Sequence, residues 1–457
     1  MEKQKFSARV KQAMGEASIT NLYQLNGMVP VHKAIPFGLQ HILAMFVANI
    51  APILIVGGAC GLAASDMAML IQSAMLIAGI GTLIQLFPLW RIGSGLPIVM
   101  GISFTFVSIM CYIGTNYGYG TIMGAVLIGG LIEGCLGLFA KYWIKIISPI
   151  VSASVVTAIG FSLLSVGSTS FGGGSGSENF GSVENWILGT ITLLCCILFN
   201  IFAKSYWKQL SVLFGLIVGY LVAIPMGLVD FSSLAGTSVI ALPHLMPFKM
   251  EFHLNAIISV ALIFLVSATE TIGDTQALAN SGLNRSATTK EISGSLACDG
   301  FISSLSSLFG CMPITSFSQN VGLVAMTKVV NRFTIATGAL IMILAGIFPI
   351  FGAVLATLPD AVLGGCTIMM FGTIVVSGLQ MIGKCGYSQR NITIVALSLS
   401  IGIGFTQVPE LFSVFPKIIE TVFAENCVAV VFLVAVILNL ILPQNMEAFE
   451  EKKAANE

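Results

Sequence analysis

Long apolar runs alternate with short polar loops from about residue 36 to residue 442. Each run is long enough to cross a bilayer as an α-helix, which takes about 20 residues. The residue-by-residue alternation of a membrane β-barrel is scarce. The pattern therefore predicts an all-α polytopic membrane protein with fourteen crossings. The predicted crossings are residues 35–56, 66–88, 95–113, 119–140, 146–166, 184–203, 209–228, 252–272, 292–310, 312–330, 333–351, 359–380, 390–407 and 425–442.

The basic residues of the loops test this count, because Lys and Arg collect on the cytoplasmic side of membrane proteins. With both termini inside, Lys249 and Lys417 fall on the outer side, which leaves 18 of the 20 basic residues in the cytoplasm. A shift by one crossing would destroy this partition. Residues 1–34 and 444–457 are therefore expected in the cytoplasm. Replacing the ninth and tenth crossings by a re-entrant hairpin keeps every loop on its side, so that alternative stays open.

The two halves of the chain show faint similarity to each other. Prolines and small polar residues recur at offsets of 210 and 216 residues. An odd number of crossings per half requires the halves to be inverted, so we expect two inverted repeats of seven. Interrupted segments at matching places in two repeats are typical of a transporter's substrate site. The matched residues are Pro149 with Pro359, Thr157 with Thr367, Phe161 with Phe371, Pro97 with Pro313 and Ser103 with Gln319.

The stretch 310–332, GCMPITSFSQNVGLVAMTKVVNR, interrupts the tenth crossing. It carries Pro313 and then a run of polar residues where a membrane helix would carry leucines. Unpaired backbone groups at membrane depth are costly unless protein or a watery cavity encloses them. Together with the region of Pro97 in the third crossing, this stretch predicts two short extended segments that build a binding site.

Four carboxyl groups, those of Glu133, Glu270, Asp274 and Asp299, lie within or at the ends of predicted crossings. An ionisable group at the bilayer centre costs about 3 kcal/mol on insertion scales, so each is a functional hypothesis. Glu270 and Asp274 are four residues apart and share a helix face. Two carboxylates that close repel each other, which favours holding a proton. Such a pair is useful in a proton-coupled carrier.

Several of these polar residues also have a structural interpretation. Ser267-x-x-Glu270, and the Ser-x-x-Gln that ends at Gln319, both fit the capping box that satisfies a helix start. The apolar run before Ser267 argues against a new helix there. Glu133 lies among glycines, where a buried, protonated structural carboxyl is the favoured interpretation. His41 is a lone histidine on an apolar helix, where a neighbour usually satisfies the imidazole.

Composition agrees with a membrane protein, since 56% of the residues are hydrophobic and 9% are charged. The first 30 residues lack an apolar core and a cleavage site, so no cleaved signal peptide is expected. Ten scattered cysteines and four histidines show no zinc spacing and no nucleophile with a base. We therefore expect no metal, no cofactor and no enzyme. The expected partners are the bilayer and a small molecule rather than nucleic acid.

The string Gln319-Asn320-x-Gly322-x-x-x-x-Thr327-Lys328 resembles the signature of the nucleobase-ascorbate transporter family, also called nucleobase-cation symporter-2. The Gln-His pair of the first crossing, the ETIGD of the eighth and the CDG of the ninth stand where that family has polar landmarks. The resemblance covers residues 30–443. It implies the substrate-binding residues Glu270, Gln319, Ser103 and Asn320, with Asp299 and His41 in coupling or supporting roles. Asp274 is expected in a supporting role because of its spacing to Glu270.

The same resemblance implies an architecture and an activity. Residues 35–140 and 231–352 would form a core domain that holds the site. Residues 141–230 and 353–443 would form a gate domain that mediates homodimerisation in the plasma membrane. The implied activity is import of a purine dione, xanthine or uric acid or both, by proton symport. Ser103 stands where xanthine-specific members carry Asn and urate-transporting relatives carry Ser or Thr, which argues against strict xanthine specificity.

Two alternatives stay open from the sequence. Uracil or another nucleobase is the first, although Gln followed by Asn resembles the purine-dione carriers. An anion exchanger or channel of the same architecture is the second, and it should offer a cation near the binding site. The central stretch contains no Lys or Arg before Lys328. Whether H+ or Na+ is the coupled ion also stays open, with H+ as the expectation.

Overall fold

The computed structural model describes residues 17–444 except residues 175, 205, 232–239 and 425. The predicted cytoplasmic segments 1–34 and 444–457 lie partly outside the described residues, which leave out 1–16 and 445–457.

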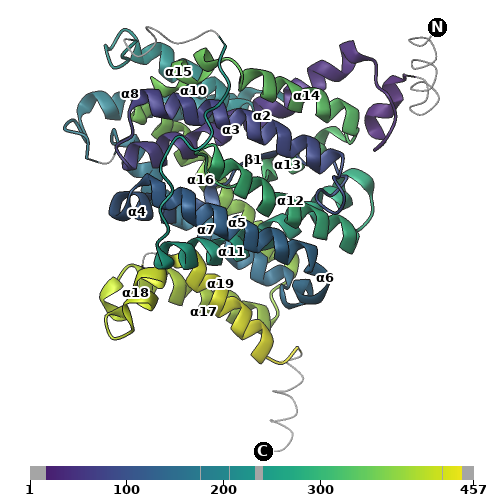
Figure 1. Cartoon of the computed structure of the whole chain (residues 1–457), viewed down its shortest axis with the longest axis vertical. Coiled ribbons are helices and arrows are strands. Elements are labelled where there is room, and N and C mark those ends of the chain that lie inside the picture. Colours follow the sequence, from purple (N-terminus) through teal and green to yellow (C-terminus); the bar gives the residue numbers. More distant parts are fainter. Residues whose placement is uncertain (1–16, 175, 205, 232–239, 425, 445–457) are drawn as a thin grey trace, which may run out of the picture.

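Most of the described chain is α-helical, as the apolar runs predict (Figure 1). Helices suit a membrane because they satisfy their own backbone hydrogen bonds. The longer helices are α2 (Val31–Ala59), α3 (Ala64–Leu86), α4 (Val107–Tyr117), α5 (Tyr119–Leu138), α7 (Pro149–Phe171), α8 (Val183–Phe202), α10 (Ser211–Ala223), α11 (Leu254–Leu283), α12 (Thr289–Leu308), α13 (Ser318–Thr327), α14 (Arg332–Ala345), α15 (Pro349–Ala356), α16 (Asp360–Cys385), α17 (Gln389–Thr406) and α19 (Cys427–Ile441). The short helices are η1 (Ile19–Tyr23), η2 (Phe104–Phe106), α6 (Ala140–Trp143), η3 (Ile144–Ile146), α9 (Tyr206–Gln209), η5 (Pro409–Phe412) and α18 (Lys417–Phe423).

Seven of the described helices are long and apolar enough to cross a membrane, and counting the bent pair α14 and α15 as one span brings this to eight. The predicted eleventh crossing is therefore not one straight helix, since its two parts meet at 76°. Gly346 ends the first part, and Pro349 begins the second where a backbone donor is not needed. Helices α10 and α19 have only 13 and 15 residues. The count of fourteen crossings stays a prediction.

The third and tenth predicted crossings are each broken into a short strand followed by a helix. Strand β1 (Met100–Ile102) leads through η2 into α4, and β2 (Ile314–Ser316) leads into α13. The strands pair antiparallel with Met100 opposite Ser316. These two residues are 316 − 100 = 216 positions apart, the offset found in the sequence. This register is the one expected where two inverted repeats meet at their symmetry axis, and it confirms the two predicted extended segments.

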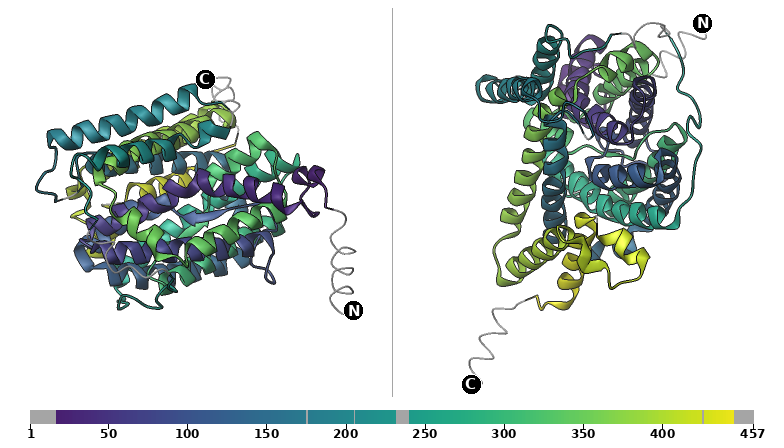
Figure 2. Two further views of the ribbon diagram at one scale, coloured as in Figure 1. Left: turned by 90° about the horizontal axis from the view of Figure 1, so that it is seen from above. Right: turned by 90° about the vertical axis from the view of Figure 1, so that its left-hand side faces the viewer.

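The helices pack in two groups, and each group takes helices from both halves of the chain. In the first group α5 lies along α12, and α14 packs on α2 and α3. In the second group α7 lies along α16, α8 packs on α10, and α17 packs on α19. The right-hand view of Figure 2 shows the light-green α16 as a column beside the first group. Strand β1 lies near the middle of the molecule in Figure 1.

Glycines let α5 and α12 touch along their backbones. A methyl group on Gly300 would lie 2.1 Å from the backbone nitrogen of Gly134, closer than real side chains approach. Gly130 of α5 is as close, since a methyl group there would lie 2.6 Å from the carbonyl oxygen of Gly300. Glycines allow such backbone contacts at close membrane helix pairs. The contact fixes the depth of the neighbouring residue, Asp299, within the first group.

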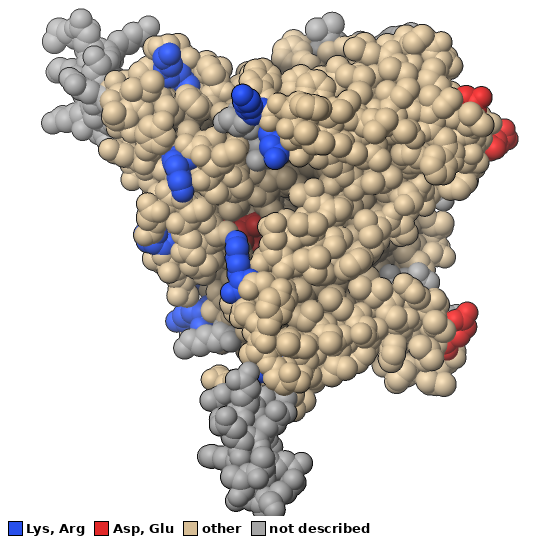
Figure 3. Space-filling model, turned by 180° about the vertical axis from the view of Figure 1, so that it is seen from behind, with Lys and Arg blue, Asp and Glu red and all other residues tan. Residues whose placement is uncertain are grey.

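Charged side chains lie at opposite edges of the surface. In Figure 3, Lys and Arg gather on one side, whereas Asp and Glu lie mainly at the opposite edge, with a broad uncharged band between them. A wide apolar band between charged edges is the surface that a bilayer requires. An acidic group is also visible in a hollow near the middle of this face, with a basic side chain beside it.

Candidate substrate site

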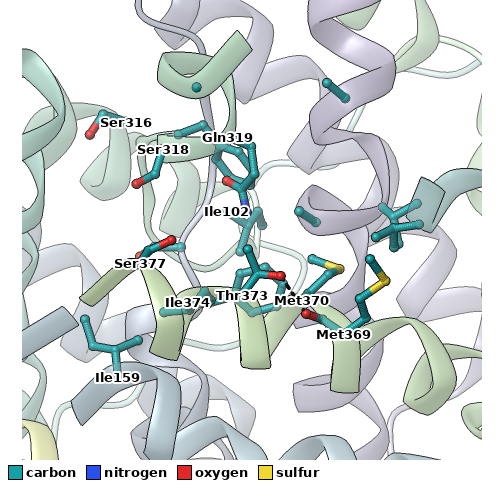
Figure 4. Close-up of a pocket in the computed structure, with 18 of the residues that line it drawn as sticks. Ile102, Ile159, Ser316, Ser318, Gln319, Met369, Met370, Thr373, Ile374 and Ser377 are labelled. Atoms are coloured by element: carbon teal, nitrogen blue, oxygen red, sulfur yellow. Dashed lines mark hydrogen bonds between the residues drawn. The ribbon is translucent and has the colours of Figure 1, made fainter. Parts of the chain in front are cut away.

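A cavity of about 330 Å³ lies beside the paired strands, lined by helices of both groups. Cavities of about 300 Å³ or more are typical of small-molecule sites. Figure 4 shows Ser318 and Gln319 on one side of it, and Met369, Met370 and Thr373 of α16 across from them. The cavity is thus built between a broken crossing of one group and an unbroken helix of the other.

Glu270 brings a carboxylate to this cavity from α11. The helix runs unbroken from Leu254 to Leu283, so the new start at Ser267 that a capping role needs is absent. The Oε2 atom of Glu270 accepts a 2.8 Å hydrogen bond from the hydroxyl of Thr105 in η2. This bond links α11 to the broken third crossing and orients the carboxylate along the wall of the cavity.

Gln319 lines the cavity from the first turn of α13. That helix has Phe317 at its N-cap with no side-chain capping bond, so the capping interpretation of Gln319 is wrong. The physical reason is that Ser316 belongs to β2 and bonds elsewhere. Within the described part of the chain, no hydrogen bond is recorded for the amide of Gln319. It is therefore free to give one hydrogen bond and accept another from a ligand.

Ser103 lies where β1 ends, and it also lines the cavity. Its backbone N–H donates a 3.0 Å hydrogen bond to the carbonyl of Pro313, which extends the pairing of the two broken crossings. Three of the four predicted substrate-binding residues, Glu270, Gln319 and Ser103, therefore line one cavity.

Asn320, the fourth predicted ligand, does not line this cavity. Its side chain is 1% exposed and points to α2, where its Nδ2 atom donates to the His41 carbonyl at 3.0 Å and lies 3.2 Å from His41 Nδ1. The different direction of Asn320 has a simple cause, since residues next to each other on a helix point about 100° apart. Asn320 and His41 thus hold α13 against α2, and they position Gln319 rather than touch a ligand in this cavity.

Asp299 ties three elements together behind the cavity. Its Oδ2 atom accepts a 2.6 Å hydrogen bond from the Thr271 hydroxyl and a 3.1 Å bond from the backbone N–H of Ser316. Its Oδ1 atom accepts from Gln85 at 3.2 Å. The carboxylate therefore fixes β2 against α11 and α3, a supporting position, and it does not line the cavity.

Asp274 supports the same strand from one turn further along α11. Its Oδ2 atom accepts hydrogen bonds from the hydroxyls of Ser318 at 2.9 Å and Ser316 at 3.3 Å. These bonds hold the junction of β2 and α13, which presents Gln319 to the cavity. Asp274 does not line the cavity itself, although Glu270 of the same helix does.

Glu133 lies outside this arrangement, as the sequence predicts. It is 2% exposed on α5, and neither of its carboxyl oxygens has a hydrogen-bond partner in the described structure. A buried carboxyl without partners is far less costly in the neutral form than in the charged form.

The sequence profile of the Permease family matches residues 32–411. The chain belongs to the nucleobase-ascorbate transporter family. It is 33% identical over 437 residues to xanthine permease XanQ of Escherichia coli, covering 92% of this chain and 94% of that protein. It is 38% identical over 379 residues to uric acid permease PucK of Bacillus subtilis, covering 82% and 88%. Nucleobase transporter PlUacP of Paenibacillus larvae is 36% identical over 430 residues, covering 93% and 98%.

Solved structures show the same fold in more distant transporters. The transmembrane domain of the cyanobacterial bicarbonate transporter BicA superimposes with a TM-score of 0.54, at 14% identity, covering 89% of this chain and 98% of that one. The anion transporter SLC26A9 of mouse gives a TM-score of 0.54, at 14% identity, covering 89% and 72%. This nucleobase-ascorbate transporter is thus a polytopic helical membrane protein with the inverted-repeat architecture.

Several residues that line or support the cavity of this nucleobase-ascorbate transporter were not predicted from the sequence. Gln85 is a polar residue in an apolar run, and that contrast could have singled it out. Thr105 could have been found from its place in the broken third crossing. Nothing in the sequence pattern points to Thr373 or Lys208, because they reach the cavity from the second group of helices. Their nearness to the cavity follows from the packing of the two groups alone.

Proposed function

We propose that this permease imports a purine dione, xanthine or uric acid or both, together with a proton. The observation that carries the proposal is the placement of Glu270 and Gln319 on one cavity. A carboxylate accepts the N–H donors at the edge of an oxopurine, and a primary amide both donates to a carbonyl and accepts from an N–H. The names of the relatives, two of which are xanthine and uric acid permeases, support the same substrate class.

A site of this kind rejects a mismatched ligand because binding it would leave a buried polar group of the protein without a hydrogen bond. A ligand that lacks an N–H for Glu270 or a carbonyl for Gln319 leaves a buried polar atom without a partner. The cavity also has apolar walls, from Met369 and Met370 on α16 and Phe104 at the start of η2, against which a flat ring can pack. These features favour a planar heterocycle with alternating donors and acceptors.

Transport proceeds in this proposal by alternating access. The first group of helices is the core domain with the site, and the second is the gate domain that also forms a homodimer. The cavity lies between them, so a movement of one against the other exposes it to either side of the plasma membrane. The partition of basic and acidic residues supports cytoplasmic termini. Glu270 accepts the coupled proton in this scheme, with Asp299 and Asp274 supporting it.

Reconstituted protein tests the function directly. Purified permease in liposomes is expected to accumulate labelled xanthine or urate when an inward proton gradient is imposed. A protonophore should abolish the accumulation, and replacing the proton gradient by a Na+ gradient should not restore it. Uracil and hypoxanthine, added as competitors, separate the purine-dione assignment from that of another nucleobase permease. Absence of uptake of both purine diones under the gradient would contradict the proposal.

Ser103→Asn is expected to narrow recognition toward xanthine. The longer amide side chain takes up room beside Glu270 and Gln319, where the additional carbonyl of urate would lie. A misfit of this size costs about 1 to 3 kcal/mol, so inhibition by urate should weaken roughly tenfold while xanthine uptake is kept. Competition by urate against labelled xanthine measures the effect. Ser103→Thr, which keeps a small hydroxyl, is the matched control, and an unchanged ratio in Ser103→Asn would show that this position does not select the ligand.

A further inference from the structure

The cavity contains a positive charge that comes from the second group of helices. Among the described residues that line it, two are ionisable: Glu270 on α11 and Lys208 on α9. Helix α9 is the single turn between α8 and α10, and Asn200 and Ser211 from these helices line the same cavity. A carboxylate and an ammonium group therefore line one cavity from separate groups of helices.

An aromatic cluster fixes the segment that carries Lys208. The rings of Phe199 on α8 and Phe214 on α10 stack with centroids 4.6 Å apart at an interplanar angle of 13°. The ring of Trp207 lies 5.9 Å from that of Phe214. Trp207 and Lys204 line an apolar groove on the outside of this cluster, whereas Lys208, the next residue after Trp207, lines the cavity. The side chains of the consecutive residues Trp207 and Lys208 therefore point into the outer groove and the cavity, respectively.

The ammonium group of Lys208 has no ion-pair partner and no hydrogen-bond partner among the described residues. The side chain of Lys208 is exposed. The ion pair found among the described residues joins Arg285 to Glu291 and does not involve Lys208. Lys208 also makes no recorded hydrogen bond. A lysine ammonium has three donors and binds as a mobile point charge. It is therefore free to pair with a negative group that enters the cavity.

The two purine diones differ in charge. Urate is a monoanion at neutral pH, whereas xanthine is mostly neutral there. An anion in the cavity is repelled by the carboxylate of Glu270, and a nearby ammonium offsets that repulsion. We propose that Lys208 recognises the negative charge of a monoanionic ligand and makes the cavity prefer urate to neutral xanthine. This inference rests on the proposed function and adds a specificity-determining residue on the other side of the cavity.

The distance between the charges of Lys208 and Glu270 depends on the conformation of the protein. Lys208 belongs to the second group of helices, whereas Glu270 belongs to the first. Any movement of one group against the other changes the separation of the two charges. The attraction of Lys208 for an anion beside Glu270 is therefore strongest in the state that brings α9 nearest to α11.

Substitution of Lys208 tests the inference by comparing two ligands in one protein. In proteoliposomes that take up labelled xanthine, Lys208→Gln is expected to raise the concentration of urate needed for half-inhibition about tenfold, the effect of losing one charge-assisted contact. The KM for xanthine should stay within about twofold of wild type, because the neutral ligand lacks the charge. Lys208→Arg keeps the charge and should keep inhibition by urate. Added salt should weaken inhibition by urate in wild type and leave Lys208→Gln unaffected.

Lys204→Gln is the matched control, because Lys204 lines the outer groove four residues away and not the cavity. It should behave as wild type with both ligands. Equal changes for urate and xanthine in Lys208→Gln, or no change for urate, would overturn the inference. Wild-type protein that imports xanthine but is not inhibited by urate would overturn it as well. Wild-type protein that imports neither purine would instead contradict the proposed function, so the two failures are distinguishable.

Discussion

Glu270→Gln is expected to reduce uptake of xanthine and urate at least a hundredfold while the protein remains in the membrane. In its ionised form the carboxyl group offers two acceptor oxygens, whereas an amide in its place offers one acceptor and one unwanted donor. Losing two charge-assisted hydrogen bonds to a ligand costs about 3 kcal/mol, which is roughly a hundredfold in affinity. The amide also cannot take up a proton. Initial rates of labelled uptake, normalised to the amount of protein in the liposomes, measure the effect.

Glu184→Gln is the control for this substitution. Glu184 lies in the first turn of α8, is exposed and does not line the cavity, so the same chemical change there should leave uptake unaltered. Uptake by Glu270→Gln at the wild-type rate would remove Glu270 from the site. Uptake that persists but no longer responds to the proton gradient would place Glu270 in coupling alone.

Asp299→Asn is expected to lower uptake about tenfold and the melting temperature by a few degrees. An asparagine that keeps the bonds from Thr271 and Ser316 must turn its NH2 group toward the NH2 group of Gln85. Gln85 cannot turn over, because its Oε1 atom accepts a 2.9 Å hydrogen bond from the N–H of Ser94. One buried donor is left unpaired, which costs about 1 to 3 kcal/mol. Thermal unfolding in detergent and uptake in liposomes measure the two effects.

The matched control is Asp66→Asn, in the first turn of α3 and remote from the cavity, which should change neither uptake nor melting temperature. A displaced β2 would shift Gln319, so the loss of uptake in Asp299→Asn should appear partly as weaker binding. Wild-type melting and uptake in Asp299→Asn would show that the three hydrogen bonds do not position the strand.

Much of the architecture could be predicted from the sequence, because a membrane restricts what a chain can do. Apolar runs must become helices there, and polar, proline-bearing stretches must be enclosed by protein. The central stretch 310–332 and the segment around Ser103 were therefore predicted to contain short extended segments, and strands β2 and β1 are found there. The offset of 216 residues even relates Met100 to its partner Ser316.

The parts that could not be predicted depend on side-chain direction and on packing between distant segments. Asn320 stands next to Gln319 in the sequence, yet it turns to His41, because the helix that begins at Ser318 sends adjacent residues in different directions. The bend between α14 and α15 replaces a single crossing, since Gly346 and Pro349 act together there. Apolar patterning carries no information on either.

The sequence predicts the residues on one side of the cavity but not those on the opposite side. The sequence identifies Glu270 and Gln319 because both are polar groups in apolar crossings. The opposite wall comes from α16 and α9, where Met370 and Lys208 look like ordinary membrane and loop residues. Their role follows from the packing of two groups of helices, which a pattern along one chain does not reveal.

A structure of the permease with bound xanthine or urate tests the central claim most directly. The purine ring is expected between Glu270 and Gln319, with the carboxylate and the amide each about 3 Å from a ring N–H or carbonyl. The ring should pack against the wall that α16 provides. A ligand bound in another place, or one that touches Gln319 while Glu270 faces away from it, would contradict the account.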